Sequence, residues 1–308
     1  MRKVNRRDFL KVAAGSAAAL PAIALAAAGP AAPKEVRLPT DAEIKKMEQA
    51  APGEPIGKPA KPRKVLVWGR MEAHEPVPYA ARALEVLGRK SGAFEAVVGS
   101  DPAAFLAPDF GNFDVIVMNN VHQRDPFLPA DIKSRPQAEQ ETLQKQNEAI
   151  HKAILEFVSG GKGIVGIHAA TAAFQSWPEY GEMMGGYYAG HLVDDVPVKI
   201  EEPGSLLCAM FPAGFKIKDE IYLFKDPYSR AKLRVLLSLD IEKMADPGKR
   251  PDKDYAVTWV REYGKGRVFY CSLGHASDVY WNPVVLKHYL AGIQFAAGDL
   301  KAEAAPRK

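Results

Sequence analysis

The stretch Gly161-Lys-Gly-Ile-Val-Gly-Ile-His168-Ala-Ala-Thr171 contains a short apolar run that ends at a histidine. Three runs of similar length and character precede it, at Lys64-Val-Leu-Val-Trp68, Phe94-Glu-Ala-Val-Val98 and Asp114-Val-Ile-Val-Met118. Short, nearly continuous apolar runs are typical of parallel strands that are buried on both faces. We therefore expect residues 163–167 to form a strand near the centre of a parallel sheet.

Helical patterns separate these runs. One covers residues 79–91, and another covers residues 138–159, with apolar residues at helical spacing and Gly160-Gly161 as its stop. Strands that alternate with helices predict an α/β fold with a doubly wound, mostly parallel sheet.

After Gly190 the sequence favours added strands in the C-terminal half. The segments with mostly extended character are 197–202, 215–224, 234–240, 256–262 and 266–272. Gly264-Lys265-Gly266 is expected to turn between the last two as a hairpin. A final helix over residues 282–297 should close the domain.

Four segments are expected along the chain. Residues 1–28 combine Arg6-Arg7 and a basic start with an Ala-rich apolar run, and they resemble a twin-arginine signal peptide. Residues 29–63 are a Pro-rich linker around one short helix near 40–50. Residues 64–300 form one globular domain, and 301–308 are a polar tail. The protein is thus expected to be periplasmic or secreted.

Removal of the signal changes the charge of the protein. The whole chain has a formal net charge of +4, but residues 1–28 hold five basic side chains and one acidic one, so the mature chain is neutral. This balance argues against a nucleic-acid partner. Glycine and proline interrupt the apolar run, so no stable membrane span is expected after cleavage, although an uncleaved anchor stays open.

Histidines cluster at the predicted strand ends. His74 follows the first strand, His122 the third, His168 the fourth and His275 the last. Ligands of open parallel sheets bind at the carboxyl ends of the strands, so these segments are the expected place of the functional site.

Several motifs together resemble the trehalose-utilisation (ThuA-like) family over residues 64–298. These are the stretch from Gly161 through Trp177 to Gly190-His191, Asp219-Glu220-Ile-Tyr222, Asp254-Tyr-Ala-Val-Thr-Trp259, Tyr263-Gly-Lys-Gly-Arg-Val-Phe-Tyr270 and Ser272-Leu-Gly-His275. The resemblance implies a fold like that of the class I glutamine amidotransferases and a role in carbohydrate metabolism.

The amidotransferase reaction itself is not expected. In that fold a nucleophilic cysteine sits on a tight turn between a strand and a helix, and here the equivalent stretch is Gly166-Ile-His-Ala-Ala170. Cys208 and Cys271 lie on other predicted strands. We expect two buried thiols, with a disulfide as the alternative.

The segments that match the family contain His168, His191, Glu220 and His275. We expect His168, Glu220 and His275 to be catalytic. His168, His191 and His275 are expected to bind a divalent metal such as zinc, which prefers such ligands. Without a metal, the same groups could transfer protons, and structural roles for His168 and Glu220 stay open.

Aromatic residues suggest the substrate. Trp177, Tyr187 and Tyr188 lie between His168 and His191, and aromatic faces stack on sugar rings, so with His74 they are expected to bind a small carbohydrate. Packing of these aromatic residues against the sheet is the alternative. The alternative for His74 is that it is a loop residue without a part in binding.

These observations predict a hydrolase, lyase or isomerase that acts on trehalose, another glycoside or a keto sugar. The rival is a non-catalytic carbohydrate-binding or accessory protein. A nucleotide cofactor is not expected, because Gly69-Arg-Met-Glu-Ala-His74 after the first strand lacks the G-x-G-x-x-G pattern. The sequence specifies neither the sugar nor the oligomeric state, and a homo-oligomer stays open.

Replacing Arg6-Arg7 by two lysines keeps the charge but removes the arginine pair, so it should leave the precursor in the cytoplasm. Cell fractionation and N-terminal sequencing check this, with the mature protein expected to begin near Ala27 or Gly29. Wild-type protein that stays in the cytoplasm with Met1 intact would contradict the prediction.

Overall fold

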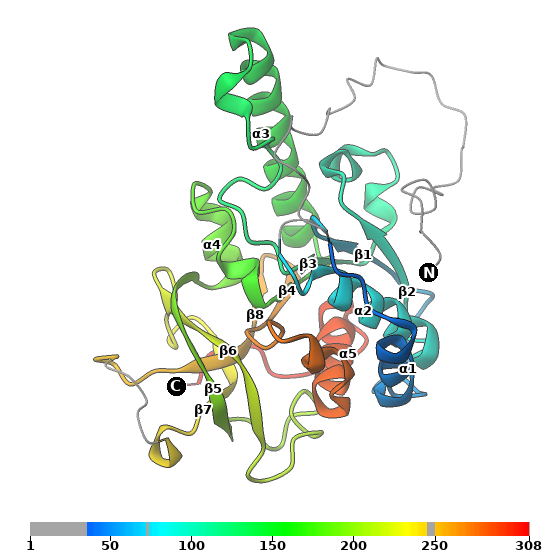
Figure 1. Ribbon diagram of the computed structural model, residues 1–308, viewed down its shortest axis with the longest axis vertical. Coiled ribbons are helices and arrows are strands. Elements are labelled where there is room, and N and C mark those ends of the chain that lie inside the picture. Colours follow the sequence, from blue (N-terminus) through cyan, green and yellow to red (C-terminus); the bar gives the residue numbers. More distant parts are fainter. Residues whose placement is uncertain (1–35, 72–73, 245–249, 308) are drawn as a thin grey trace.

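A mixed sheet runs through the centre of the computed structural model, which describes residues 36–71, 74–244 and 250–307 (Figure 1). Within those residues the sheet has nine strands in the order β2-β1-β3-β4-β9-β8-β7-β5-β6. The strands are β1 Lys64–Trp68, β2 Glu95–Gly99, β3 Val115–Asn119, β4 Gly163–Ile167, β5 Tyr187–Ile200, β6 Lys216–Lys225, β7 Arg234–Leu239, β8 Ala256–Tyr263 and β9 Gly266–Cys271.

The sheet has a parallel half and an antiparallel half. Strands β2, β1, β3, β4 and β9 pair in parallel, whereas β9, β8, β7, β5 and β6 pair antiparallel. The α/β class and the added C-terminal strands are confirmed, but only the half of the sheet from β2 to β9 is parallel. The predicted hairpin turn is confirmed too, since Tyr263 pairs with Gly266.

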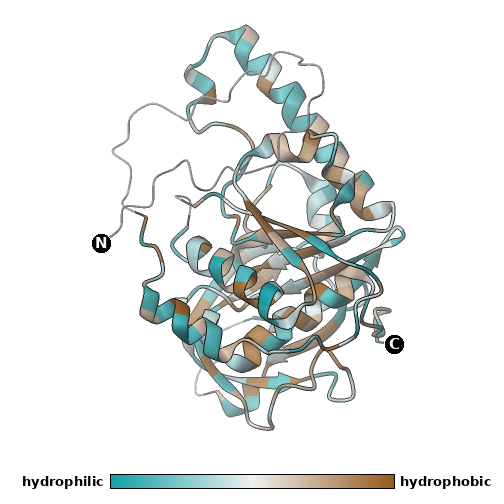
Figure 2. Cartoon of the chain, turned by 90° about the vertical axis from the view of Figure 1, so that its right-hand side faces the viewer, coloured by the Kyte–Doolittle hydropathy of each residue, from teal (hydrophilic) through white to brown (hydrophobic). Residues whose placement is uncertain are grey.

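Helices cover both faces of the sheet. They are α1 Asp41–Ala50, α2 Val77–Ser91, α3 Gln137–Ser159, α4 Pro178–Met184 and α5 Pro283–Ala297. Along β1, Val65 and Val67 pack with residues of α1, α2 and α5, whereas Leu66 and Trp68 pack with residues of α3 and α4. Alternate residues of one strand therefore enter two cores, which explains the uninterrupted apolar runs. The strands are largely brown in Figure 2, while the helices also carry teal residues.

The chain before β1 packs against the domain. Helix α1 lies where the sequence predicts it, with a capping box formed by Thr40 and Glu43, and its Met47 is fully buried. Farther on, Arg63 forms an ion pair with Asp299, with Nη2 and Oδ1 2.6 Å apart. The described part of the predicted linker thus lies against α2 and α5, whereas the predicted signal at 1–28 lies outside the described residues.

Strand β5 begins at Tyr187, well before the strand predicted at 197–202. The sequence from Tyr187 to His191 contains Gly190, with φ of +147°, and lacks the apolar alternation of a strand. Pairing with β6 over residues 187–197 makes it extended. The resulting β5–β6 hairpin carries polar side chains toward the carboxyl ends of the parallel strands.

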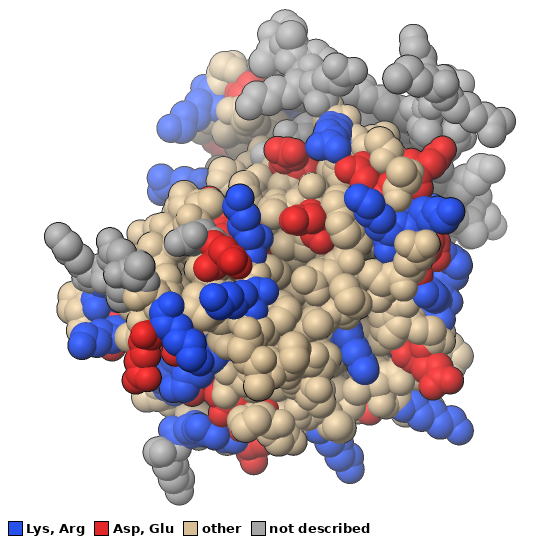
Figure 3. Space-filling view, turned by 60° about the horizontal axis from the view of Figure 1, so that its bottom comes forward, with Lys and Arg blue, Asp and Glu red and all other residues tan. Residues whose placement is uncertain are grey.

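Charges of both signs lie side by side on the face shown in Figure 3. In the described part of the chain, no helix has the length and apolar character needed to cross a membrane.

His288 on α5 gives the fold a dependence on pH. Its ring is fully buried and donates from Nδ1 to the Leu207 carbonyl at 2.7 Å, and burial lowers its pKa to about 4. The unfolded chain binds this proton near pH 6.5, so unfolding takes up a proton between pH 6.5 and 4. Stability contributed by the neutral ring is therefore lost as the pH falls through that window.

We expect His288→Asn, which cannot titrate, to flatten this dependence. Between pH 7 and 4 the wild-type protein should lose up to about 3 kcal/mol more of its free energy of unfolding than the variant does. Chemical denaturation at both pH values measures the difference. Parallel losses in the two proteins would show that His288 is not the titrating group.

Candidate functional site

His168 stands on a tight turn where β4 ends. It opens the short 3₁₀ turn His168–Thr171 and has a φ of +45°, a conformation that is rare and costly for a residue with a side chain. Its ring is fully buried, and its Nδ1 lies 2.8 Å from the carbonyl oxygen of Ser272. A carbonyl can only accept, so Nδ1 carries a proton and donates it, which leaves Nε2 to face the site.

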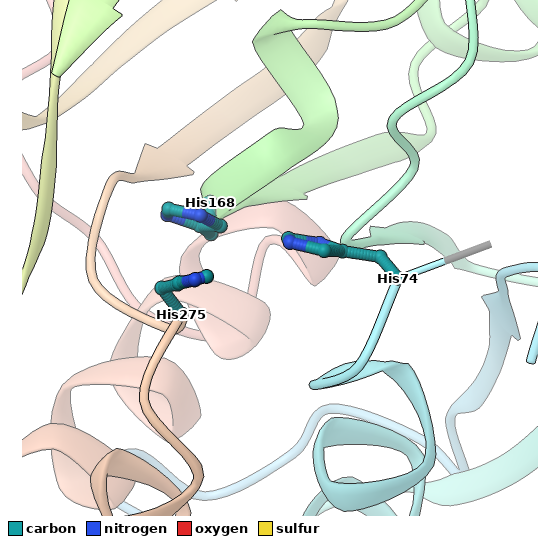
Figure 4. A group of neighbouring side chains, drawn as sticks. All are labelled: His74, His168 and His275. Carbon is teal, nitrogen blue, oxygen red and sulfur yellow. The ribbon is translucent and has the colours of Figure 1, made fainter. Parts of the chain in front are cut away.

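The sheet brings two further histidines to His168. His275 follows β9, which neighbours β4 with Ile167 paired to Cys271, and His74 follows β1. The ring centroids of His168 and His275 are 5.3 Å apart, and the ring of His74 lies 5.7 and 5.2 Å from them. The three rings offer ring nitrogens within 4.8 Å of one another and point toward a common centre (Figure 4).

Each of these rings has a buried nitrogen that makes no hydrogen bond of good geometry among the described residues, although two of the three lie within ion-pair distance of Glu220. The nitrogens are His74 Nδ1, His168 Nε2 and His275 Nδ1. Burial, together with the neighbouring imidazoles, lowers the pKa of His74 to about 3 and also lowers the pKa of His275. These two rings are thus neutral at neutral pH, with one nitrogen of each able to accept or to bind a cation, and an unpaired buried polar atom is costly unless a partner binds there.

Glu220 on β6 faces the same centre. Its Oε2 lies 3.1 Å from His168 Nε2 and 3.8 Å from His275 Nδ1, and its Oε1 lies 3.2 Å from His191 Nδ1. Burial raises the pKa of Glu220, but the close His168 and the nearby His275 and His191 outweigh burial and bring it below its usual value. A carboxylate and a nitrogen lone pair 3.1 Å apart repel each other, so this spacing calls for a proton or a cation between them.

The same residues lie in a segment that a family model matches. The model for ThuA, described as trehalose utilisation, matches residues 64–296. The chain belongs to the ThuA family. Its description connects the family with carbohydrates, and the resemblance noted from the sequence motifs is confirmed.

Solved structures with this fold include two ThuA-like proteins. One, from Bacteroides uniformis ATCC 8492, is 19% identical with a TM-score of 0.57, and the match covers 77% of this chain and 93% of that one. The other, from Parabacteroides merdae ATCC 43184, is 20% identical with a TM-score of 0.54 and coverages of 79% and 93%. A third likeness is to the cytoplasmic protein STM3548 from Salmonella typhimurium, with 13% identity, a TM-score of 0.51 and coverages of 76% and 98%.

At these identities the likeness shows the fold alone. No curated protein matches the chain.

The structure of this ThuA-family chain brings His168, Glu220, His275 and His191 together, as the sequence motifs led us to expect. His191 differs from the other two histidines, because it contacts the outer carboxylate oxygen of Glu220 and its side chain is 42% exposed. Tyr188 accompanies it, with its hydroxyl 2.8 Å from His191 Nδ1. The pair thus lies between Glu220 and solvent.

His74 is the member of the cluster whose role sequence reasoning missed. It was expected to contact substrate from a loop of ordinary polar composition, whereas its ring stacks on three others, including the exposed His122 at 5.3 Å. The signal that could have found it is its place after β1, since β1, β3, β4 and β9 all end at one edge.

Trp177 and Tyr187 lie apart from the cluster of His74, His168 and His275. Trp177 is 4% exposed and stacks on His151 of α3, with ring centroids 3.8 Å apart. The Tyr187 hydroxyl donates to the carbonyl of Phe174 and also contacts the carbonyl of Trp177. Both side chains pack around α4, which is the structural alternative weighed above.

The two cysteines are free and buried, as expected. Burial raises the pKa of Cys208 and of Cys271 to about 12, so neither forms a thiolate at neutral pH. The strained turn after β4 carries His168 and no cysteine.

Proposed function

We propose that this ThuA-family chain is a sugar-processing enzyme whose centre is formed by His74, His168, His275 and Glu220. Its substrate would be trehalose, another glycoside or a keto sugar, and its reaction a hydrolysis, elimination or isomerisation. The observation that carries the proposal is the convergence of three unpartnered imidazole nitrogens within 4.8 Å beside a carboxylate. Groups of this kind, partly buried with shifted pKa values, are typical of catalytic sites.

The three histidines suit a divalent ion such as zinc. Neutral imidazole is a preferred zinc ligand, and a set of three protein ligands leaves a coordination position open. The hydrogen bond from His168 Nδ1 to the Ser272 carbonyl supports this role, because such a bond directs the other nitrogen of a ligating histidine to the metal. A zinc ion bound there would polarise a sugar carbonyl or activate a water molecule.

Glu220 would act as the base. Its lowered pKa keeps it ionised at neutral pH, so it would accept a proton first rather than donate one. The proton can leave through Oε1, because His191 lies 3.2 Å from that oxygen and is open to solvent. Tyr188 would orient His191 through its hydroxyl.

Further features fit a small carbohydrate. Tyr188 packs its ring 4.4 Å from that of Tyr222, and Tyr222 in turn contacts His168, so partly exposed aromatic surface lies next to the centre. The parallel half of the sheet with helices on both faces supports a doubly wound, amidotransferase-like arrangement. With a twin-arginine signal at residues 1–28, the reaction would take place outside the cytoplasm.

Metal content tests the centre. Protein purified without chelator, or reloaded with zinc, should hold about one equivalent, and His168→Ala should hold none because it removes one of only three nitrogens. Elemental analysis measures this. The matched control is His151→Ala, which removes a partly buried histidine on α3 that lies apart from the cluster.

Zinc bound equally by the wild type and by His168→Ala would refute the metal centre. Sugar binding that persists in a metal-free protein and in His168→Ala would favour the non-catalytic carbohydrate-binding protein instead.

Glu220→Gln separates catalysis from metal binding. The amide keeps the size of the side chain but cannot take a proton, so turnover of the sugar should fall by about 10²- to 10⁴-fold while zinc stays bound. Turnover assays alongside elemental analysis of the same sample check both parts. Unchanged turnover would remove Glu220 from the reaction.

A further inference from the structure

We propose that Asp219 is the positioning residue of the centre: its carboxylate holds the loop that carries His275 and fixes His168. The inference rests on the function proposed above, since it concerns how the same histidines are held. It gives Asp219 a role distinct from that of the neighbouring Glu220.

The Asp219 side chain is hydrogen-bonded to backbone amide groups. Its side chain is buried and accepts three consecutive amide N–H groups after β9: Oδ2 from Gly274 at 2.6 Å, and Oδ1 from His275 at 3.1 Å and from Ala276 at 2.8 Å. Three N–H donors on one side chain fix its orientation relative to the loop. Asp219 therefore holds the backbone amide of His275 and the amides of the residues directly before and after it.

The carbonyl groups of the same loop are held as well. Ser272 accepts from His168 Nδ1, Leu273 from the Tyr289 hydroxyl at 2.8 Å and Gly274 from the Tyr280 hydroxyl at 2.6 Å. Because the Ser272 carbonyl selects the tautomer of His168, a shift of this loop would move His275 and at the same time free the ring of His168. The position of the loop thus determines two of the three nitrogens.

Gly274 leaves little freedom to the loop. It has a φ of +133°, and a Cβ there would lie 2.7 Å from the Tyr280 hydroxyl. The loop is therefore packed as well as hydrogen-bonded, and it tolerates few alternative positions. Glu220, the next residue of β6, faces the imidazole rings. Strand β6 therefore supports the centre through Asp219 and contacts its rings through Glu220.

Asp219→Asn tests the proposal, because the amide keeps one acceptor oxygen but turns an NH₂ group toward a backbone N–H. We expect zinc to bind about 10- to 100-fold more weakly, as is typical when the group that orients a metal ligand is changed. Isothermal titration calorimetry on the metal-free full-length protein measures the dissociation constant, and denaturation of the same metal-free sample measures stability.

Asp114→Asn is the matched control. Asp114 is also buried and also accepts a backbone N–H, from Lys64 at 3.1 Å, but it holds the start of β1 with Arg63 and contacts no residue of the centre. A general loss of stability should appear in both variants, whereas weaker zinc binding should appear only in Asp219→Asn.

Tyr280→Phe provides a second change to the same loop, since it removes the hydroxyl that donates to the Gly274 carbonyl and accepts from Asn120 Nδ2 at 2.8 Å. A smaller loss of zinc affinity is expected, and this variant decides the question if Asp219→Asn does not fold. Zinc affinity equal to wild type in whichever of the two variants folds would overturn the positioning role and leave the metal centre standing. A wild-type protein that binds no zinc would overturn the proposed function, and this inference with it.

Discussion

The hydrogen bond between His168 Nδ1 and the Ser272 carbonyl is the contact on which the arrangement of the centre depends. It joins the segments that follow two neighbouring parallel strands, β4 and β9, and it does so inside the protein where no water competes. Because a carbonyl only accepts, this one bond decides which nitrogen of His168 is free. The φ of His168 is strained, but strand β4 before the residue, the 3₁₀ turn after it and the hydrogen bond of its ring keep it in that conformation.

Much of this arrangement could be predicted from the sequence. The runs at 64–68, 114–118 and 163–167 are almost continuously apolar. This pattern identifies them as parallel strands, because such strands are buried on both faces. Strands of that kind end at one edge, which made the convergence of His168 and His275 predictable although more than a hundred residues separate them. Family motifs added Glu220, which no local pattern would have singled out.

Other features depended on tertiary contacts that the sequence does not encode locally. His74 stands in a loop without regular periodicity, and only the pairing of β1 with β3 brings it to the other rings. Trp177 is of a residue type that often binds sugars, yet α3 on the same face of the sheet supplies His151 as its stacking partner. Strand β5 begins in a stretch containing Gly190 and becomes extended because β6 lies beside it.

The division of the sheet into two halves has a consequence for how the chemistry is distributed. The three imidazoles are attached to the rigid parallel half, whereas Glu220, His191 and Tyr188 belong to a hairpin at the far edge of the antiparallel half. Under the proposed function, the ion-binding nitrogens and the proton acceptor would therefore belong to different halves of the sheet. Substitutions on the hairpin at positions other than Asp219 would change the proposed proton acceptor or the aromatic surface beside it, while the loop that carries His275 keeps its hydrogen bonds.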